Sequence, residues 1–361
     1  MLVLACALIT SCSTPRTDQE LIEQTIDPAI VGEERRKMAE IMRLLPPAHR
    51  DNVIYLSENG QIYANKPSLR GEFRLSRQIS DRVYETAWGE KFVLPSSGSP
   101  DDVSKLEYTC IPVSTGPFRR IATQRGVNVS GGRFSYAYAQ VSLPGEGSVY
   151  GLQNSSGDQI ETPFVYLGGH STTSSGSIMT EVDGGVQWSQ AKKDWALYLK
   201  SGSNVAVQNN QVRLFSPVTI SLEFYVPSDG SVAIRVTGGT VRTGINRTLV
   251  TSASGWSKSG VGNVIKRLTT IAQASTNPNS GSFLLNVSWL DTKLGRFTGT
   301  GLTPIGQGIP VAELRQWGQY SRDIDPDNVN DGFGIGCSQP ANRVTVDAFL
   351  SYAEDVNIDL R

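Results

Sequence analysis

Residues 218–236 read VTISLEFYVPSDGSVAIRV, and this stretch decides the fold class. Apolar and polar residues alternate in both halves, on either side of the turn residues at 227–230. Successive side chains of a strand point to opposite faces, so alternation predicts a strand with one face buried and one in water. The apolar positions are Ile220, Leu222, Phe224, Val226, Val232, Ile234 and Val236. The stretch therefore predicts antiparallel strands.

Short β-rich runs recur from Leu106 onward, separated by Gly, Ser, Asn and Pro. They are Phe134–Val141, Pro163–Leu167, Gly185–Trp188, Trp195–Leu199, Val212–Phe215, Leu249–Thr251, Phe283–Trp289 and Val344–Leu350. One helix is expected among them, near Val261–Ala274, where apolar residues recur at helical spacing. Long helices do not alternate with the strands, which disfavours a doubly wound parallel sheet. We therefore expect residues 105–361 to form a mainly β domain, a two-sheet antiparallel β-sandwich of the jelly-roll type.

With its closing run Val344–Tyr352 (VTVDAFLSY), the pattern resembles the concanavalin A-like lectin and glucanase superfold. This resemblance implies a sandwich and leaves function open. Retaining glucanases of that fold carry an E-x-D-x-x-E or E-x-D-x-E strand, with nucleophile and acid/base carboxylates about 5 Å apart. Glu181-Val182-Asp183 begins such a motif, but Gly185 or Val186 occupies the third acidic position. A glucanase of that family is therefore not expected.

A small helix-and-hairpin segment is expected at residues 33–104, before the sandwich. Its elements are a helix Glu33–Leu45, a hairpin of Val53–Leu56 with Ile62–Ala64, and a turn-rich boundary at Pro95–Asp102. Acidic residues suit the first turn of the helix, and Pro46-Pro47 ends it. The Asn59-Gly60 pair between two apolar runs is a strong hairpin signal.

The chain opens MLVLACALITSC, with an apolar run too short to span a bilayer as a permanent helix. The run is long enough for a signal peptide, and Ile9-Thr10-Ser11-Cys12 resembles the lipobox of bacterial lipoproteins. The resemblance implies that Cys12 is lipidated, that residues 1–12 are signal and lipobox, and that residues 13–32 are a polar tether. The protein is then exported and anchored in the cell envelope. A missing basic residue before the run leaves other export, or an intracellular protein, as alternatives.

Composition excludes some partners and limits the cysteine chemistry. With 33 basic and 34 acidic residues the net charge is −1, which gives no reason to expect nucleic acid as a partner. Only 2 His residues make a histidine-built metal site or a Ser-His-Asp triad a poor prospect. Cleavage before Cys12 would leave Cys110 and Cys337, a single pair that an exported chain could oxidise to a disulfide. Two separate buried thiols are the alternative.

The densest aromatic and polar stretch runs from Phe164 to Tyr198. Sugar sites use aromatic faces against the apolar side of a ring, with amides and carboxylates for the hydroxyls. The candidate glycan-binding residues are Tyr166, Asp183, Gln187, Trp188 and Tyr198. In a regular strand Trp188 and Gln187 take opposite faces, so one must be core unless a bulge intervenes. The alternative is that these alternating aromatics belong to a sheet core.

Two further groups of residues could form a lyase centre and a calcium site. A polysaccharide lyase would need a base and a group that neutralises a uronate, and His170, Tyr166, Tyr198 and Arg235 could supply them. The run DIDPDNVNDG resembles a calcium loop, because Ca²⁺ needs several oxygens from a short segment. Its candidate ligands are Asp323, Asp325, Asp327 and Asp331. Position six is Asn328 and position twelve is Gly334, and an exposed acidic turn is the alternative.

The sequence thus predicts an exported envelope lipoprotein whose β-sandwich binds polysaccharide or envelope glycan. Calcium is the one cofactor expected. A carbohydrate-active enzyme, either a polysaccharide lyase or a glycoside hydrolase, is one alternative. A purely structural envelope protein is the other.

Overall fold

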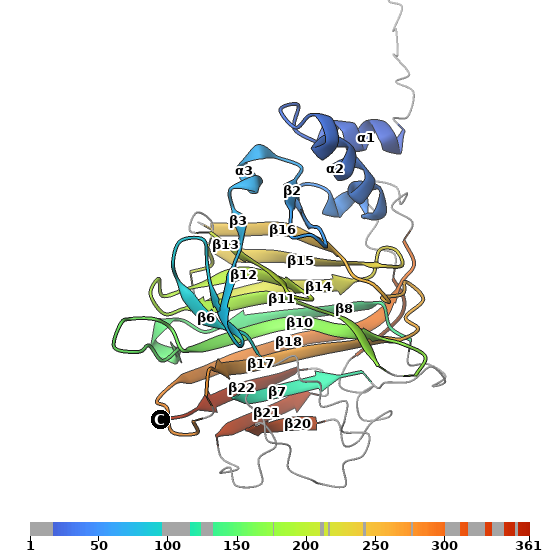
Figure 1. Cartoon of the computed structure of the whole chain (residues 1–361). Coiled ribbons are helices and arrows are strands. Elements are labelled where there is room, and N and C mark those ends of the chain that lie inside the picture. Colours follow the sequence, from blue (N-terminus) through green and yellow to red (C-terminus); the bar gives the residue numbers. More distant parts are fainter. Residues whose placement is uncertain are drawn as a thin grey trace, which may run out of the picture.

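The computed structural model describes residues 17–95, 116–123, 133–175, 177–209, 213–215, 217–240, 243–275, 277–299, 311–316, 329–333, 343–350 and 353–361. Two large β-sheets face each other, and smaller layers cover their outer sides (Figure 1). The mainly β two-sheet sandwich expected from the alternating runs is confirmed.

The first large sheet, sheet A, has 11 strands, nine of them in the order β2-β1-β16-β15-β14-β8-β18-β22-β21, with β19 and β9 also paired to β18. Its strands are β1 Val53–Leu56, β2 Ile62–Ala64, β8 Tyr136–Leu143, β9 Val149–Tyr150, β14 Val218–Tyr225, β15 Ser231–Thr240, β16 Thr243–Ser252, β18 Phe283–Phe297, β19 Val311–Gln316, β21 Val344–Leu350 and β22 Ala353–Asp359. The opening stretch of sequence forms β14 and β15, which pair antiparallel.

The second large sheet, sheet B, has 8 strands in the order β20-β7-β17-β10-β11-β12-β13-β3. Its strands are β3 Phe73–Leu75, β7 Pro117–Ala122, β10 Glu161–Thr172, β11 Ile178–Ser189, β12 Asp194–Ser201, β13 Asn204–Gln208, β17 Asn263–Gln273 and β20 Val329–Phe333. A three-stranded sheet C consists of β4 Arg77–Ser80, β5 Val83–Glu85 and β6 Lys91–Val93.

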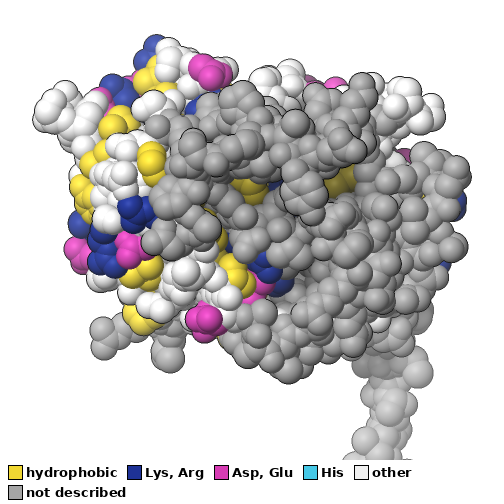
Figure 2. All heavy atoms as spheres, turned by 90° about the horizontal axis from the view of Figure 1, so that it is seen from below, with side chains coloured by type: hydrophobic (Ala, Val, Ile, Leu, Met, Phe, Trp, Pro, Cys, Tyr) yellow, Lys and Arg dark blue, Asp and Glu magenta, His cyan; other side chains and the backbone are white. Residues whose placement is uncertain are grey.

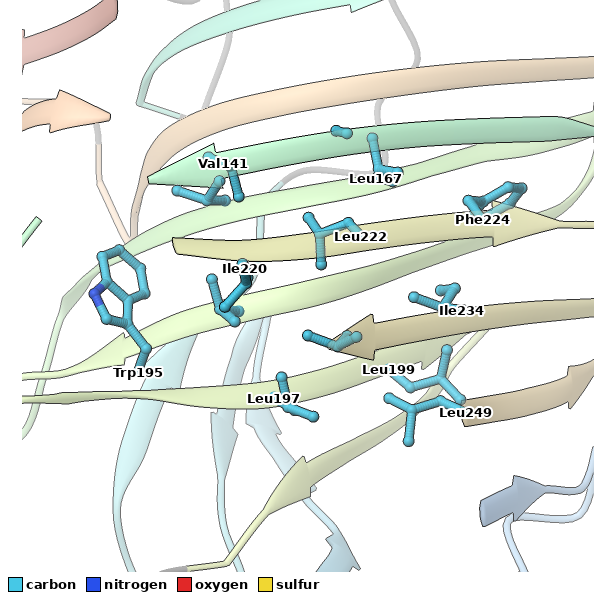
Figure 3. Packing of buried hydrophobic residues seen from close by; sticks show 14 of the residues in the cluster. Val141, Leu167, Trp195, Leu197, Leu199, Ile220, Leu222, Phe224, Ile234 and Leu249 are labelled. Atoms are coloured by element: carbon cyan, nitrogen blue, oxygen red, sulfur yellow. The ribbon is translucent and has the colours of Figure 1, made fainter. Parts of the chain in front are cut away.

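The main core lies between sheets A and B. Figure 3 shows Leu222 and Ile234 of sheet A and Leu167 and Leu197 of sheet B within one packed cluster. Each of these side chains is completely buried. Burying such a side chain stabilises the fold by roughly 1.5–3 kcal/mol. The alternation of β14 and β15 therefore places one apolar face in this core, as the sequence predicts.

The N-terminal segment is a layer on the outer face of sheet A. Its helices are α1 Asp18–Thr25, α2 Gly32–Leu44 and α3 Pro67–Arg70. The helix and the hairpin predicted in residues 33–64 are both present. The prediction that residues 13–32 are a polar tether is wrong in part, because residues 18–25 are helical. A Thr17–Glu20 capping box marks the start of α1. Ile22, Ile26 and Ile30 are buried against α2, and this apolar spacing outweighs the polar composition.

This layer is also part of the sandwich itself. Strand β1 pairs parallel with β16 of sheet A, and β3 pairs antiparallel with β13 of sheet B. The N-terminal segment therefore extends both sheets rather than preceding them as a separate unit.

The helix predicted near Val261–Ala274 is wrong. Residues 263–273 form β17, a central strand between β10 and β7 with every residue buried. Its β-branched residues favour a strand, and burial on both faces removes the simple alternation that would have revealed it.

Sheet C covers part of the outer face of sheet B. Tyr84, Phe92 and Leu94 pack there against Phe164 and other side chains of sheet B. Seen from below, the described side chains mix apolar, basic and acidic groups (Figure 2), in keeping with the net charge of −1. Within the described residues, no helix is both long enough and apolar enough to cross a membrane.

Candidate functional site

Trp188 is a core residue. It lies in the cluster between the two sheets, 1% exposed, with its ring centroid 5.4 Å from that of Trp195. Its indole N–H donates to Gln190 Oε1 at 3.0 Å, so its polar atom is satisfied. Strand β11 pairs with β10 without a bulge at Gly184-Gly185, so Gln187 takes the opposite face, as strict alternation requires.

The other four predicted glycan-binding residues lie together on the outer face of sheet B, but they are buried. Tyr166 and Tyr198 are each 1% exposed, and Asp183 and Gln187 are each 4% exposed. Tyr166, Tyr198 and Phe164 pack edge to face under sheet C. A buried ring cannot stack on a sugar, so the open groove predicted from this stretch is wrong.

A compact charged cluster takes the place of the groove. Lys266 Nζ lies 2.8 Å from Glu181 Oε1 and 3.1 Å from Asp183 Oδ1, and Lys200 Nζ contacts Glu181 Oε2. Register places Lys266 of β17 opposite Gly168 of β10, and Gly168 opposite Asp183 of β11, so the lysine reaches its carboxylates across β10. Gly168 makes the approach possible, since a Cβ there would lie 2.1 Å from Asp183 Oδ1.

The protonation states of this cluster follow from burial and from its two lysines. Burial alone would raise the pKa of Glu181, but Lys266 and Lys200 outweigh it and lower that pKa to about 2. For Lys266 the effect of burial is outweighed by the two carboxylates, which raise its pKa. Burial raises the pKa of Asp183, the least exposed of the carboxylates. Glu181 and Lys266 thus form a firmly charged pair.

The cluster does not form the lyase centre considered from the sequence. Burial raises the pKa of Tyr166 and of Tyr198, which makes both phenols poor bases. His170 is a buried residue of β10. Arg235 lies on β15 of sheet A, where it contacts His49 and Glu223, so the set is not assembled.

A second feature, which we call the Trp88 cavity, lies where the turn between β5 and β6 meets the β11–β12 connection. Its volume is about 430 Å³, and its lining includes Trp88, Glu90, Gln153, Asp158 and Lys192. Trp88 is half-buried, and its indole N–H donates to Glu90 Oε2 at 3.1 Å. Lys192 Nζ lies 5.3 Å from the centroid of the Trp88 ring. The ring is thus fixed in place at the wall of an open hollow.

The charges around the Trp88 cavity are balanced. Lys91 Nζ pairs with Asp158 at 2.8 Å, and Lys192 Nζ lies 4.0 Å from Glu90 Oε2. Gln153 adds a carboxamide, which donates to the Gly157 carbonyl at 2.7 Å. The lining therefore offers hydrogen-bonding groups and an aromatic ring without a net charge.

An ion-paired guanidinium lies behind this cavity. Arg213 is 2.6 Å from Asp194 and 3.8 Å from Glu90. Burial raises the pKa of Asp194 to about 6, although Arg213 opposes the shift. Asp194 is 3% exposed and does not line the cavity. Of the two carboxylates, Glu90 alone could touch a ligand there.

Sequence reasoning missed Trp88 because it concentrated on the aromatic density of residues 164–198. A signal was present. Trp88-Gly89-Glu90 lies between the short strands β5 and β6, and a large aromatic residue in a turn is placed where it can remain accessible. The remaining lining comes from loops far apart in the sequence.

Several predicted residues lie outside the described part of the chain: Cys12, Cys110, Cys337, Asp323, Asp325 and Asp327. Asp331 falls on the backbone of β20, opposite Arg119 of β7, so the end of the proposed calcium loop is a strand. Within the described residues, no group of three His, Cys, Asp or Glu side chains could hold a metal ion. Lipidation, disulfide and calcium stay predictions.

No family model and no curated protein matches this chain. Solved structures give loose likenesses. Scytalido-glutamic peptidase with a transition state analog inhibitor has a TM-score of 0.40 and 10% identity, covering 68% of this chain and 98% of that one. SCP-B, an eqolisin-family peptidase in complex with the tripeptide Ala-Ile-His, has a TM-score of 0.33 and 9% identity, covering 67% and 98%.

The CBM2 module of the evolved Dit of Lactobacillus casei BL23 phage J-1 has a TM-score of 0.26 and 10% identity. The match covers 57% of this chain and 91% of that one. The resemblance to concanavalin A-like proteins stays a prediction.

Proposed function

We propose that this protein is an exported, envelope-anchored β-sandwich that binds a neutral glycan in the Trp88 cavity. The observation that carries the proposal is the half-buried Trp88 ring, held by Glu90 and surrounded by amide and carboxylate side chains. An indole face suits the apolar side of a sugar ring, while amides and carboxylates suit its hydroxyls.

Size and charge support the same ligand class. A volume of about 430 Å³ falls within the usual range for small-molecule sites. The paired charges of Lys91 with Asp158 and Lys192 with Glu90 give no preference for a charged ligand. Neutral sugars are the polyhydroxylated ligands that such a lining favours.

A glycan array followed by calorimetry tests the proposal. Trp88→Ala should weaken binding of the best glycan at least tenfold, which corresponds to about 1.4 kcal/mol. Phe215→Ala is the matched control, because Phe215 is 55% exposed and does not line the cavity. Gln153→Ala removes a lining group without touching the packed ring, and should also weaken binding. An array on which the wild type binds nothing, or full binding by both cavity variants, would contradict the proposal.

Glycoside hydrolysis is a second candidate, favoured by one observation. Two carboxylates, Glu90 and Asp158, line the Trp88 cavity, and glycoside hydrolysis uses a pair of carboxyl groups on either side of the scissile bond. Release of reducing ends from a bound glycan, abolished in Glu90→Gln, would favour hydrolysis; binding without turnover would exclude it for that glycan.

A further inference from the structure

A line of side chains connects the wall of the Trp88 cavity to Asp194, a buried carboxylate that does not line the cavity. The Trp88 indole N–H donates to Glu90 Oε2 at 3.1 Å. Arg213 Nη1 lies 3.8 Å from the same oxygen, and Arg213 Nε lies 2.6 Å from Asp194 Oδ1. Asp194 is therefore linked to the ring through one guanidinium and one carboxylate.

Glu90 is held at both of its oxygens. Oε1 accepts from the Ser189 hydroxyl, and Oε2 accepts from the indole of Trp88. Ser189 at the end of β11 pairs in register with Asp194 at the start of β12, so both strand ends take part in the arrangement. The carboxylate of Glu90 thus positions the indole, and a change at Oε2 reaches the ring directly.

The charges of this group cancel while Asp194 is ionised. The charged groups that face Asp194 are Arg213, Lys192 of the β11–β12 connection and Glu90 of the β5–β6 turn. Two cations then stand against two carboxylates. The side chains of Arg213 and Asp194 are buried, so water stabilises neither charge. If Asp194 became neutral, Glu90 would be the carboxylate nearest to Arg213 among the described residues.

Loss of the charge on Asp194 would change how the ring is held. A buried guanidinium without a paired anion is costly, so Arg213 would move toward Glu90 Oε2. A charged donor makes a stronger hydrogen bond than the neutral indole N–H, and the bond to Trp88 would weaken. A ring that is free to turn loses more entropy when it stacks on a sugar. Glycan binding should therefore be tighter while Asp194 is ionised.

We propose that Asp194 is a positioning residue that controls the affinity of the Trp88 cavity for its glycan, acting through Arg213 and Glu90. The inference rests on the proposed function, because it concerns the same cavity. Burial raises the pKa of Asp194 to about 6, although Arg213 opposes the shift. The carboxylate is thus ionised at neutral pH and mostly protonated at pH 5, so glycan binding weakens in acid.

Calorimetry on the full chain with the best glycan from the array, at pH 7.5 and pH 5, tests the proposal. The wild type should bind about tenfold more weakly at pH 5. Asp194→Asn keeps the shape of the side chain without its charge, so it should bind at both pH values as weakly as the wild type does at pH 5. A merely structural role would lower the melting temperature without removing the pH dependence.

Glu146→Gln is the matched control for this experiment. Glu146 pairs with Lys193, the neighbour of Asp194, but its side chain is 64% exposed and does not line the cavity. This variant also changes a carboxylate to an amide, and it should keep the pH dependence of the wild type.

A measurement without glycan covers the case in which Asp194→Asn fails to fold. The tryptophan fluorescence of the wild type minus that of Trp88→Phe should change near pH 6, as the ring loses its bond to Glu90. Absence of glycan binding by the wild type at both pH values would overturn the proposed function and this inference with it. Equal wild-type affinity at the two pH values, a pH dependence that persists in Asp194→Asn, or a fluorescence difference that stays flat through pH 6 would overturn this inference alone.

Discussion

Two adjacent residues of β11, Gln187 and Trp188, lie in different environments because successive side chains of a strand point to opposite faces. Trp188 points into the core between the sheets, and Gln187 points to the outer face of sheet B. Asp183 shares the outward face with Gln187, where Lys266 meets it. The strand therefore carries an apolar face and a charged face, and its side chains serve packing and ion pairing rather than an open groove.

Trp188→Ala should behave as a core deletion. Its ring fills space beside Trp195 within the main cluster, so we expect a loss of about 3–5 kcal/mol in the free energy of unfolding. Urea unfolding measures this loss, with Phe215→Ala as a surface control that should change stability by less than about 0.5 kcal/mol. Equal effects of the two substitutions would mean that Trp188 is not in the core.

At the scale of elements, β17 and α1 show how context overrides local pattern. Residues 263–273 contain apolar residues at helical spacing, yet they form a strand because neighbours on both sides bond to them. Residues 18–25 are mostly polar, yet their one isoleucine, Ile22, is buried in the same cluster as the apolar residues of α2. In both cases the deciding contacts come from segments distant in the sequence or in the next element.

His49 links the N-terminal layer to sheet A by hydrogen bonds. This side chain is 1% exposed; Nδ1 lies 2.8 Å from the Tyr225 hydroxyl, and Nε2 lies 3.2 Å from Arg235. Glu223 and Tyr136 complete the buried group. Burial, helped by Arg235, lowers the pKa of His49 from 6.5 to about 3, so the ring is neutral in the folded protein at neutral pH.

We expect acid to weaken the fold through His49. The unfolded chain takes up a proton as pH falls through 6.5, while the folded chain resists until about pH 3, so stability falls over that interval. The loss attributable to His49 is about 4–5 kcal/mol, and burial of Glu223, which raises its pKa, opposes it. Unfolding in urea at pH 7, 5 and 4 should show a flatter pH dependence for His49→Gln than for the wild type. Parallel curves would contradict this assignment.

At the scale of the whole molecule, the sandwich is covered on both outer faces. The N-terminal helices pack on part of the outer face of sheet A, and sheet C packs on part of the outer face of sheet B (Figure 1). Two cavities, one lined by Trp88 and one lined by Arg82, lie at the ends of sheet C, where its turns meet the connections of sheet B. Covering a sheet thus leaves cavities at the margins of the cover.

Envelope anchoring is a prediction for the whole protein. If Cys12 is lipidated, mass spectrometry of a membrane fraction should find a diacylglyceryl group on it, and Cys12→Ala should release the protein. Acyl chains contribute roughly 0.8 kcal/mol per buried methylene, so their loss should abolish membrane association. Recovery of the intact N-terminal run from soluble cytoplasm would contradict the prediction.

The sequence by itself determined the mainly β class, the alternating strands β14 and β15, a helix near residues 33–45 and the hairpin on Asn59-Gly60. These depend on alternation and turn chemistry, which act over a few residues. Only the tertiary structure decided that Tyr166 and Tyr198 are covered, that β17 is a strand, and that Trp88 and Arg82 line cavities. Burial and cavities arise where distant segments meet, and a local pattern carries no record of which layer covers a given face.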